Sequence, residues 1–130
     1  MPIKEETKNI IFNKLKKFLE KLTPPLVVNT HSETDSFEVI GNKPVPYGSS
    51  NKIVEGMYFG SIAKRKDSVV FYFFPCYMNP KLIEDVPEII KCLKGKTCFH
   101  FKREEQINEK ELQLILNRGM DEWKKLGYVV

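Results

Sequence analysis

Two cysteines and a histidine in the last third of the chain carry the most distinctive chemistry. Cys92, Cys98 and His100 offer thiolate and imidazole groups, which are the ligands that zinc prefers. A closed zinc site takes four ligands and usually draws two of them from a C-x(2–4)-C pair. Five residues separate these two cysteines, and the chain has no second pair. The spacing therefore favours cysteines that pack as small apolar side chains.

A cysteine nucleophile at Cys76 would need an adjacent base and a group that orients the base. His31 lies in a polar stretch and His100 in a predicted strand, so the sequence places neither histidine beside Cys76. The chain also lacks the motifs G-x-S-x-G, G-x-x-x-x-G-K-[ST] and G-x-G-x-x-G. We therefore expect no catalytic residues and no resident cofactor, and we predict that the protein is not an enzyme.

Two acidic clusters offer carboxylates that could hold a hard cation. One lies in the predicted linking helices and the other near the start of the last predicted helix. Acidic residues in the first turn of a helix are also expected simply from the helix dipole, so both interpretations stay open. The residues concerned are Glu84, Asp85, Glu88, Glu104, Glu105, Glu109 and Glu111.

Aromatic residues gather in the middle of the chain, near a stretch at residues 41–52 that is rich in Gly, Pro, Ser and Asn. Such residues can line a ligand pocket, and they can equally build a sheet core whose tyrosine hydroxyls reach the rim. No glycine-aromatic pattern typical of RNA-binding sheets accompanies them, so we do not expect nucleic acid there. The candidate ligand-binding residues are Tyr47, Tyr58, Tyr72 and Tyr77, with Phe74 among them.

The bulk properties are those of an ordinary globular protein. The chain has 130 residues, 42% hydrophobic and 29% charged, which corresponds to a single domain over residues 1–130. It begins MPIKEETK and has no apolar run long enough to span a bilayer, so we expect a cytoplasmic protein without membrane contact. Its formal net charge is +4, and the basic first predicted helix could bind phosphates or an acidic partner, or simply present a solvated outer surface. The lysines concerned are Lys8, Lys14, Lys16, Lys17 and Lys21.

The pattern of apolar residues predicts α+β architecture. Helical spacing predicts a first helix over residues 5–22, and Asn108 with Glu111 predicts the start of a last helix that ends at Gly127 and packs Trp123 on the sheet. Strands are predicted at residues 37–40, 54–63, 68–74 and 97–101, with a turn at 64–67. We expect one domain in which a twisted antiparallel sheet of four to six strands is packed by the N- and C-terminal helices.

Alternation within the strands predicts which side chains share a face. In residues 54–63, Met57, Phe59, Ser61 and Ala63 should lie on one face, and Tyr58, Gly60 and Ile62 on the other. In the last strand Phe99 and Phe101 should point inward, opposite Cys98 and His100. Residues 68–74 are apolar on both faces, which is typical of a strand covered on each side. Residues 41–52 should be irregular.

The run MYFGSIAKRKDSVVFYFFPCYMNPKLIEDV, the run LKGKTCFHFK and the ending KKLGY together resemble the YdhG-like family, also called DUF1801. The similarity covers about residues 55–128 and rests on packing positions. The resemblance implies an α+β fold similar to that of frataxin-type iron chaperones and, for this chain, an iron-delivery role. An iron site in this chain would use carboxylates, and the acidic clusters that the sequence offers for it are Glu84, Asp85, Glu88, Glu104 and Glu105.

Three functional hypotheses follow from the sequence. The first is a non-catalytic cytoplasmic binding module whose small-molecule or protein ligand lies against residues 41–52 and the tyrosines. The second is a frataxin-like iron-binding protein that uses the acidic clusters. The third is an adaptor that contacts a protein or nucleic acid through the lysines of the first helix.

Overall fold

The computed structural model describes residues 3–29, 35–47 and 52–130. The long helices are α1 (Glu5–Glu20) and α3 (Glu109–Lys125), and a short helix α2 spans Pro75–Met78. Three 3-10 turns follow or precede them at η1 (Pro80–Ile83), η2 (Ile89–Cys92) and η3 (Glu104–Gln106). The strands are β1 (Val27–Val28), β2 (Ser36–Ile40), β3 (Val45–Tyr47), β4 (Lys52–Val54), β5 (Tyr58–Lys64), β6 (Val69–Phe73), β7 (Leu93–Lys94) and β8 (Cys98–Phe101).

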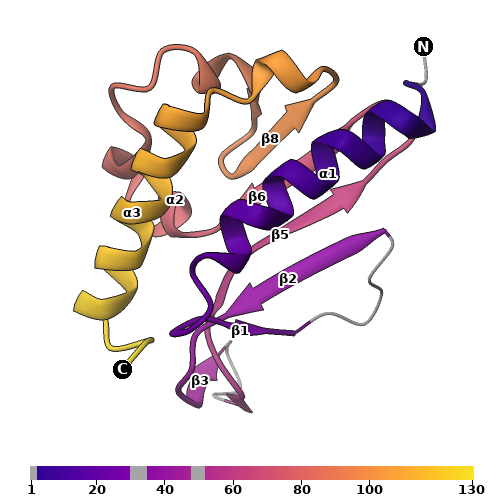
Figure 1. Ribbon diagram of the computed structural model, residues 1–130. Helices are drawn as coiled ribbons and strands as arrows, with labels where there is room; N and C mark the ends of the chain where they lie inside the picture. Colours follow the sequence, from indigo (N-terminus) through magenta and orange to yellow (C-terminus); the bar gives the residue numbers. More distant parts are fainter. Residues whose placement is uncertain (1–2, 30–34, 48–51) are drawn as a thin grey trace.

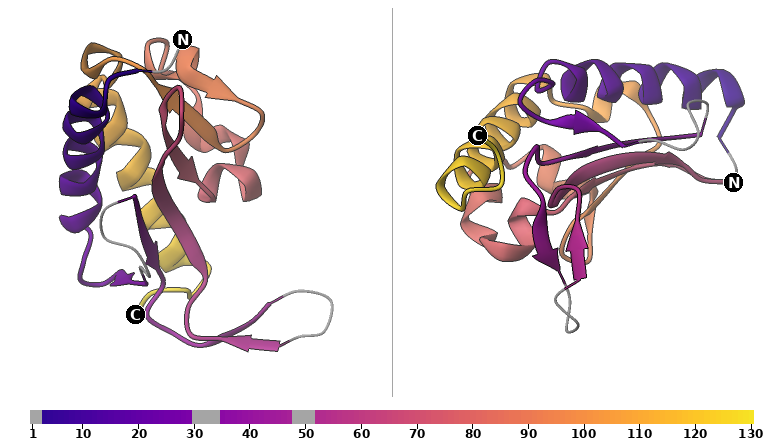
Figure 2. Two further views of the ribbon diagram at one scale, coloured as in Figure 1. Left: turned by 90° about the vertical axis from the view of Figure 1, so that its right-hand side faces the viewer. Right: turned by 90° about the horizontal axis from the view of Figure 1, so that it is seen from below.

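Six of these strands form one antiparallel sheet in the order β1-β2-β5-β6-β8-β7, and β3 pairs with β4 in a separate hairpin (Figure 1). The α+β class and the antiparallel sheet flanked by N- and C-terminal helices are therefore as the sequence predicts. Helix α1 runs across one face of the sheet, and the β3–β4 hairpin points away from the sheet on the opposite side (Figure 2, right).

The face of the sheet beneath the helices is apolar. One row of register partners runs across five strands as Phe37, Ile62, Phe71, Phe99 and Leu93. All but Leu93 are buried, and Leu93 packs against the same core. Burial of side chains this large stabilises the fold by about 1.5–3 kcal/mol each, so this row anchors the sheet to α1 and α3.

Helix α1 presents its apolar stripe to this row because Ile11, Leu15 and Phe18 recur at helical spacing and are all buried. Helix α3 begins where the Asn108 side chain accepts a hydrogen bond from the Glu111 amide at 3.0 Å. Its Trp123 ring packs edge-on against Phe59, with 5.7 Å between ring centroids. The predicted cap and the predicted packing of Trp123 are both confirmed.

The strand prediction at residues 54–63 is wrong in two respects. Val54 belongs to β4, and the chain turns at Gly56 before β5 begins. Val39 pairs with Gly60, but the next residue, Ile40, pairs with Tyr58. Phe59 is therefore an extra residue, a β-bulge in β5, and the simple alternation fails there. As a result Tyr58 and Ser61 lie on the same side and share a hydrogen bond, although alternation predicts opposite sides.

One further expectation needs correction. Residues 45–47 are not irregular, because β3 pairs with β4 from Val45↔Val54 to Tyr47↔Lys52. Strand β6 is central, and its two faces differ: Phe71 and Phe73 are buried beneath the helices, whereas on the other face Val70 is buried and Tyr72 is half-buried. The sheet thus has a helix-covered face and a second face of different character.

Candidate functional site

The face of the sheet opposite α1 carries polar and aromatic side chains. One row of register partners crosses it as Glu38, Ser61, Tyr72, Cys98 and Lys94. The next row is Ser36, Ala63, Val70 and His100, of which Val70 alone is buried. We call the surface made by these two rows the open face. A sheet face with this composition is not built to bury against a helix, because its polar groups would lose their water.

A strip of aromatic rings borders the open face. Tyr58 lies 5.7 Å from Phe74, and Phe74 stacks on Tyr77 with 5.7 Å between centroids and 11° between ring planes. Tyr77 is 57% exposed, and Lys96 places its ammonium 5.6 Å from the centre of that ring. We call Tyr58, Phe74 and Tyr77, together with Tyr72 of the open face, the aromatic strip.

Hydrogen bonds hold the hydroxyl groups of this strip. Tyr58 and Ser61 share one, and the Arg65 guanidinium donates to the Tyr72 hydroxyl at 3.0 Å. Burial raises the pKa of Tyr58 to about 12, and the nearby Glu38 carboxylate adds to the effect against the Ser61 hydrogen bond, which lowers it. Tyr58 is therefore a neutral hydrogen-bonding group at pH 7.

The structure brings together three of the four predicted tyrosines. Tyr58, Tyr72 and Tyr77 all belong to the aromatic strip. The backbone of Tyr47 pairs with Lys52 in the β3–β4 hairpin, but its side chain falls outside what the structure describes, as do residues 48–51 of the predicted loop. The described part of the candidate site therefore consists of the residues on and beside the sheet.

Sequence analysis missed a group of cations at one end of the open face. They surround a pocket of about 340 Å³ formed by the β5–β6 turn, β7 and the end of β8. We call this the basic pocket; its lining residues are Arg65, Lys66, Asp67, Ser68, Lys94, His100 and Lys102. The KRKD turn at residues 64–67 was a visible signal, but its partners on β7 and β8 are brought near only by the sheet register.

The two predicted acidic clusters touch where the Glu111 carboxylate accepts hydrogen bonds from the Glu88 and Ile89 amides at 3.0 and 2.7 Å, but several of their other carboxylates pair with separate cations. Glu88 pairs with Lys91 at 3.3 Å, Glu104 with Lys14 at 3.4 Å and Glu105 with Arg103 at 3.7 Å. Asp85 adopts a left-handed backbone with φ of 62°, and Arg118 donates to the carbonyl oxygen of Glu84 at 2.8 Å. Within residues 3–29, 35–47 and 52–130, no group of three or more His, Cys, Asp or Glu side chains could hold a metal ion. Iron binding stays a prediction from the sequence.

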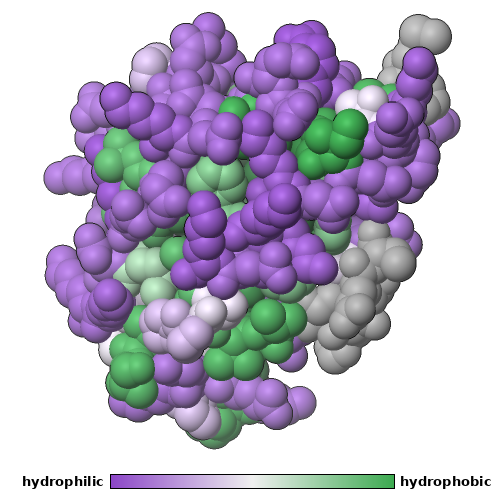
Figure 3. Space-filling model, in the orientation of Figure 1, coloured by the Kyte–Doolittle hydropathy of each residue, from purple (hydrophilic) through white to green (hydrophobic). Residues whose placement is uncertain are grey.

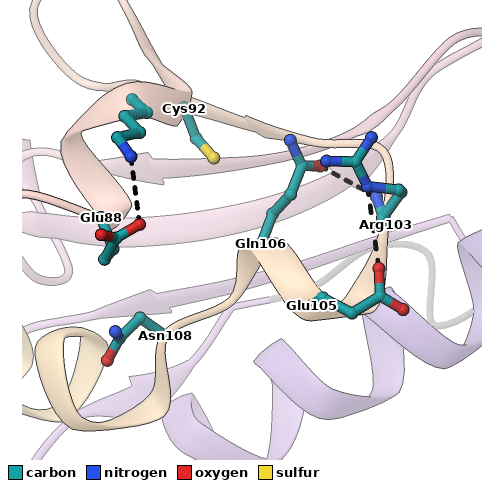
Figure 4. A pocket seen from close by; sticks show the side chains of 7 residues that line it. Glu88, Cys92, Arg103, Glu105, Gln106 and Asn108 are labelled. Atoms are coloured by element: carbon teal, nitrogen blue, oxygen red, sulfur yellow. Dashed lines mark hydrogen bonds and ion pairs between the residues drawn. The ribbon is translucent and has the colours of Figure 1, made fainter.

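A second pocket, of about 320 Å³, lies between η2 and η3 (Figure 4). Its charges are paired: Glu88 with Lys91, and Arg103 with Glu105. Burial raises the pKa of the Cys92 thiol in its wall, although Arg103 opposes that effect. A protonated thiol among neutralised charges offers neither a nucleophile nor a strong ligand-binding charge.

The remaining thiols do not form a catalytic or metal-binding set either. The Cys76 sulfur lies 3.0 and 3.1 Å from the carbonyl oxygens of Phe73 and Lys96, so its one proton can be donated to either, and burial raises the pKa of this thiol to about 11. Cys98 and His100 share the open face, whereas Cys92 belongs to the core on the other side of the sheet. His31 lies outside the described residues.

The lysines of α1 are largely engaged within the protein. Lys14 reaches both Glu104 and Glu109, and Lys8 reaches Glu5 at 4.0 Å. Lys16 and Lys21 lie over the rings of Phe37 and Phe18. The α1 side of the molecule is mostly hydrophilic, and an apolar patch lies over β1 where Val27 and Val28 are exposed (Figure 3).

Comparisons of the chain with protein-family models, with curated proteins and with solved structures find no match. The resemblance to the YdhG-like family stays a prediction, and the functional argument depends on the geometry. Among the described helices, none combines the length and the apolar character needed to cross a membrane. The fold and the site define an α+β protein with one helix-covered sheet face and one open face.

Proposed function

We propose that the protein is a non-catalytic binding module whose ligand lies on the open face against the aromatic strip. The observation that carries the proposal is the contrast between the two faces of one sheet. The covered face has an apolar row from Phe37 to Leu93, while the open face has the polar row from Glu38 to Lys94. Aromatic side chains at the edge of a polar, half-exposed surface suit a ligand with a planar apolar part.

The side chains of the strip are positioned before any ligand arrives. Tyr77 stacks on Phe74, which is itself held edge-on by Trp123 with 6.1 Å between centroids. Tyr72 receives the hydrogen bond from Arg65, so its hydroxyl is also fixed. A surface whose rotamers are already restricted loses less conformational entropy on binding, which favours affinity.

The non-catalytic part of the proposal is supported by the state of the thiols. Cys76 and Cys92 both have raised pKa values because they are buried, so neither is an activated nucleophile. Cys98 shares the open face with Tyr72 and His100, but the group beside its sulfur is the Thr97 hydroxyl at 3.7 Å, which is not a base.

The test is a screen of small aromatic compounds by amide chemical shifts, followed by affinity measurements on variants. Tyr77→Ala removes the exposed ring, and we expect an affinity loss of about 2- to 12-fold, which corresponds to one aromatic contact. Leu126→Ala, which removes an exposed apolar side chain just after α3, is the control and should leave affinity unchanged. If Tyr77→Ala and Tyr72→Phe lower stability yet leave the affinity of every detected compound unchanged, the site is wrong.

A further inference from the structure

The basic pocket is built by the register of three strands. The β5–β6 turn is closed by a hydrogen bond from the Arg65 amide to the Ser68 carbonyl oxygen at 2.8 Å. Val70 lies opposite His100, which brings the turn beside the end of β8. Lys94 lies opposite Cys98 and so faces the same side of the sheet as His100. Residues from three separate segments therefore line one concave surface.

Positive charge dominates this pocket. Four of its side chains are basic (Arg65, Lys66, Lys94 and Lys102), and Asp67 is the one carboxylate among the described residues that line it. No ion pair joins any of these four cations to a carboxylate among the residues that the structure describes. Like charges held near one another repel, and an anion bound among them would relieve that repulsion.

Lys64, the residue before Arg65, has a structural role. Lys64 points to the other face of the sheet, where it pairs with Glu5 at 3.5 Å and lies 5.4 Å from the centre of the Phe12 ring. Arg65, one residue later, forms no ion pair with any carboxylate in the described part of the chain and reaches over the open face to Tyr72. The turn thus uses one cation to hold α1 and directs the next into the basic pocket.

Neutral hydrogen-bonding groups complete the pocket. Ser68 is 5% exposed, and its hydroxyl lies 3.4 Å from Nδ1 of His100. Burial lowers the pKa of His100, and Lys94, Lys102 and Arg65 lower it further, so all three cations act on one imidazole. The field that disfavours another proton on His100 is the same field that would attract an anion.

We propose that the basic pocket binds a phosphate monoester group, with the rest of the ligand lying along the aromatic strip. This inference rests on the proposed function for the position of the ligand's remainder, and it names the chemistry of the ligand's charged end. Several cations around one small cavity suit a dianion with three terminal oxygens. A continuous phosphate backbone is less suited, because Glu38 places a carboxylate in the row that such a strand would cross.

The experiment uses inorganic phosphate and phenyl phosphate as probes and measures affinity by calorimetry and amide shifts. Lys94→Gln combined with Lys102→Gln removes two cations from the pocket. We expect the double variant to bind both probes at least about tenfold more weakly, because each lysine makes a charge-assisted contact. The control is Lys124→Gln with Lys125→Gln, which loses the same charge at the exposed end of α3, far from the β5–β6 turn (Figure 1). It should bind within about twofold of the unmodified protein, since distant surface charges are screened.

The two probes separate this inference from the proposed function. If phenyl phosphate binds no more tightly than phosphate and Tyr72→Leu has no effect, while the lysine variant still weakens both, the pocket stands and the rest of the ligand does not lie along the aromatic strip; Tyr72 is the strip residue to test because Arg65 of the pocket contacts it. If the two double variants lose affinity equally, or neither probe shifts the amides of Arg65, Ser68 and His100, the basic pocket is not an anion site. Tighter binding of a single-stranded oligonucleotide without terminal phosphate than of phenyl phosphate would also overturn the assignment of a monoester.

Discussion

Replacement of Tyr58 by Phe should have opposite effects on stability at neutral and at alkaline pH. The substitution keeps the ring that packs on Phe74 and removes only the hydroxyl that is hydrogen-bonded to Ser61. At pH 7 the loss of this hydrogen bond should lower the free energy of unfolding by about 1 kcal/mol. Ser61 is half-buried and can regain a water, which keeps the cost near that value.

At alkaline pH the Tyr58 hydroxyl lowers the stability of the unmodified protein. Its pKa is raised from 10.0 to about 12, mainly by burial, so from pH 10 upward the unfolded chain releases this proton while the folded protein retains it. The contribution of Tyr58 to the free energy of unfolding is therefore fully present below pH 10 and is lost as the pH rises towards 12. Two pH units correspond to about 2.7 kcal/mol, and partial exposure of the side chain reduces this to roughly 1–2 kcal/mol. Since Phe does not titrate, the variant escapes this loss.

The two effects predict a crossing of the stability curves between pH 10 and pH 12. Urea unfolding of both proteins at several pH values measures it, and all other titrating groups cancel in the difference between the two proteins. Tyr77→Phe, which removes a hydroxyl from an exposed ring, is the control and should change stability little at any pH. A constant difference between Tyr58→Phe and the unmodified protein across this range would refute the buried environment assigned to Tyr58.

Two further predictions test the packing beneath the open face. In Gly119→Ala the new Cβ would lie 2.8 Å from the Phe73 ring. We expect the destabilisation from overpacking, about 1–3 kcal/mol, to outweigh the gain of about 1 kcal/mol in helix propensity. Urea unfolding measures the net change in stability, and a more stable variant would contradict the close contact. A thiol reagent at mildly alkaline pH should modify the partly exposed Cys98 quickly. Cys76 is 2% exposed and has a pKa of about 11, so we expect it to react only as the protein unfolds. Equal reaction rates for the two thiols in the folded protein would show that Cys76 is accessible.

The helices and the interior of the sheet were accessible to sequence reasoning because their signals are local. The stripe from Ile11 to Phe18 and the Asn108 cap each lie within a few residues, and both long helices start where predicted. Strand β8 followed its alternation, with Phe99 and Phe101 buried and Cys98 and His100 on the open face.

The errors arose where distant segments decide the local structure. The bulge in β5 depends on β2, which pairs through Val39 and Ile40. Strand β7 has only two residues, too few to show alternation, and it exists because Leu93 pairs with Phe99.

In the candidate site, too, the part that depends on nearby residues was predictable from the sequence and the part that depends on distant segments was not. Tyr58, Tyr72 and Tyr77 lie within 20 residues of one another in the chain, and the aromatic-rich sequence was enough to group them. The basic pocket joins the β5–β6 turn to Lys94 and Lys102, which are about 30 residues further on. No periodicity links such positions; only the pairing of β6 with β8 and of β8 with β7 does.

The ends of the sheet have a consequence for behaviour in concentrated solution. The outermost strands, β1 and β7, have two residues each, so each edge presents few unpaired backbone groups to a neighbouring molecule. Pro24 and Pro25, just before β1, lack the amide hydrogens that would lengthen that edge, and Lys94 places a charge on the other. Short, interrupted and charged edges discourage amyloid-like stacking of one copy on the next. The molecule can thus leave one sheet face uncovered without recruiting further copies along its margins.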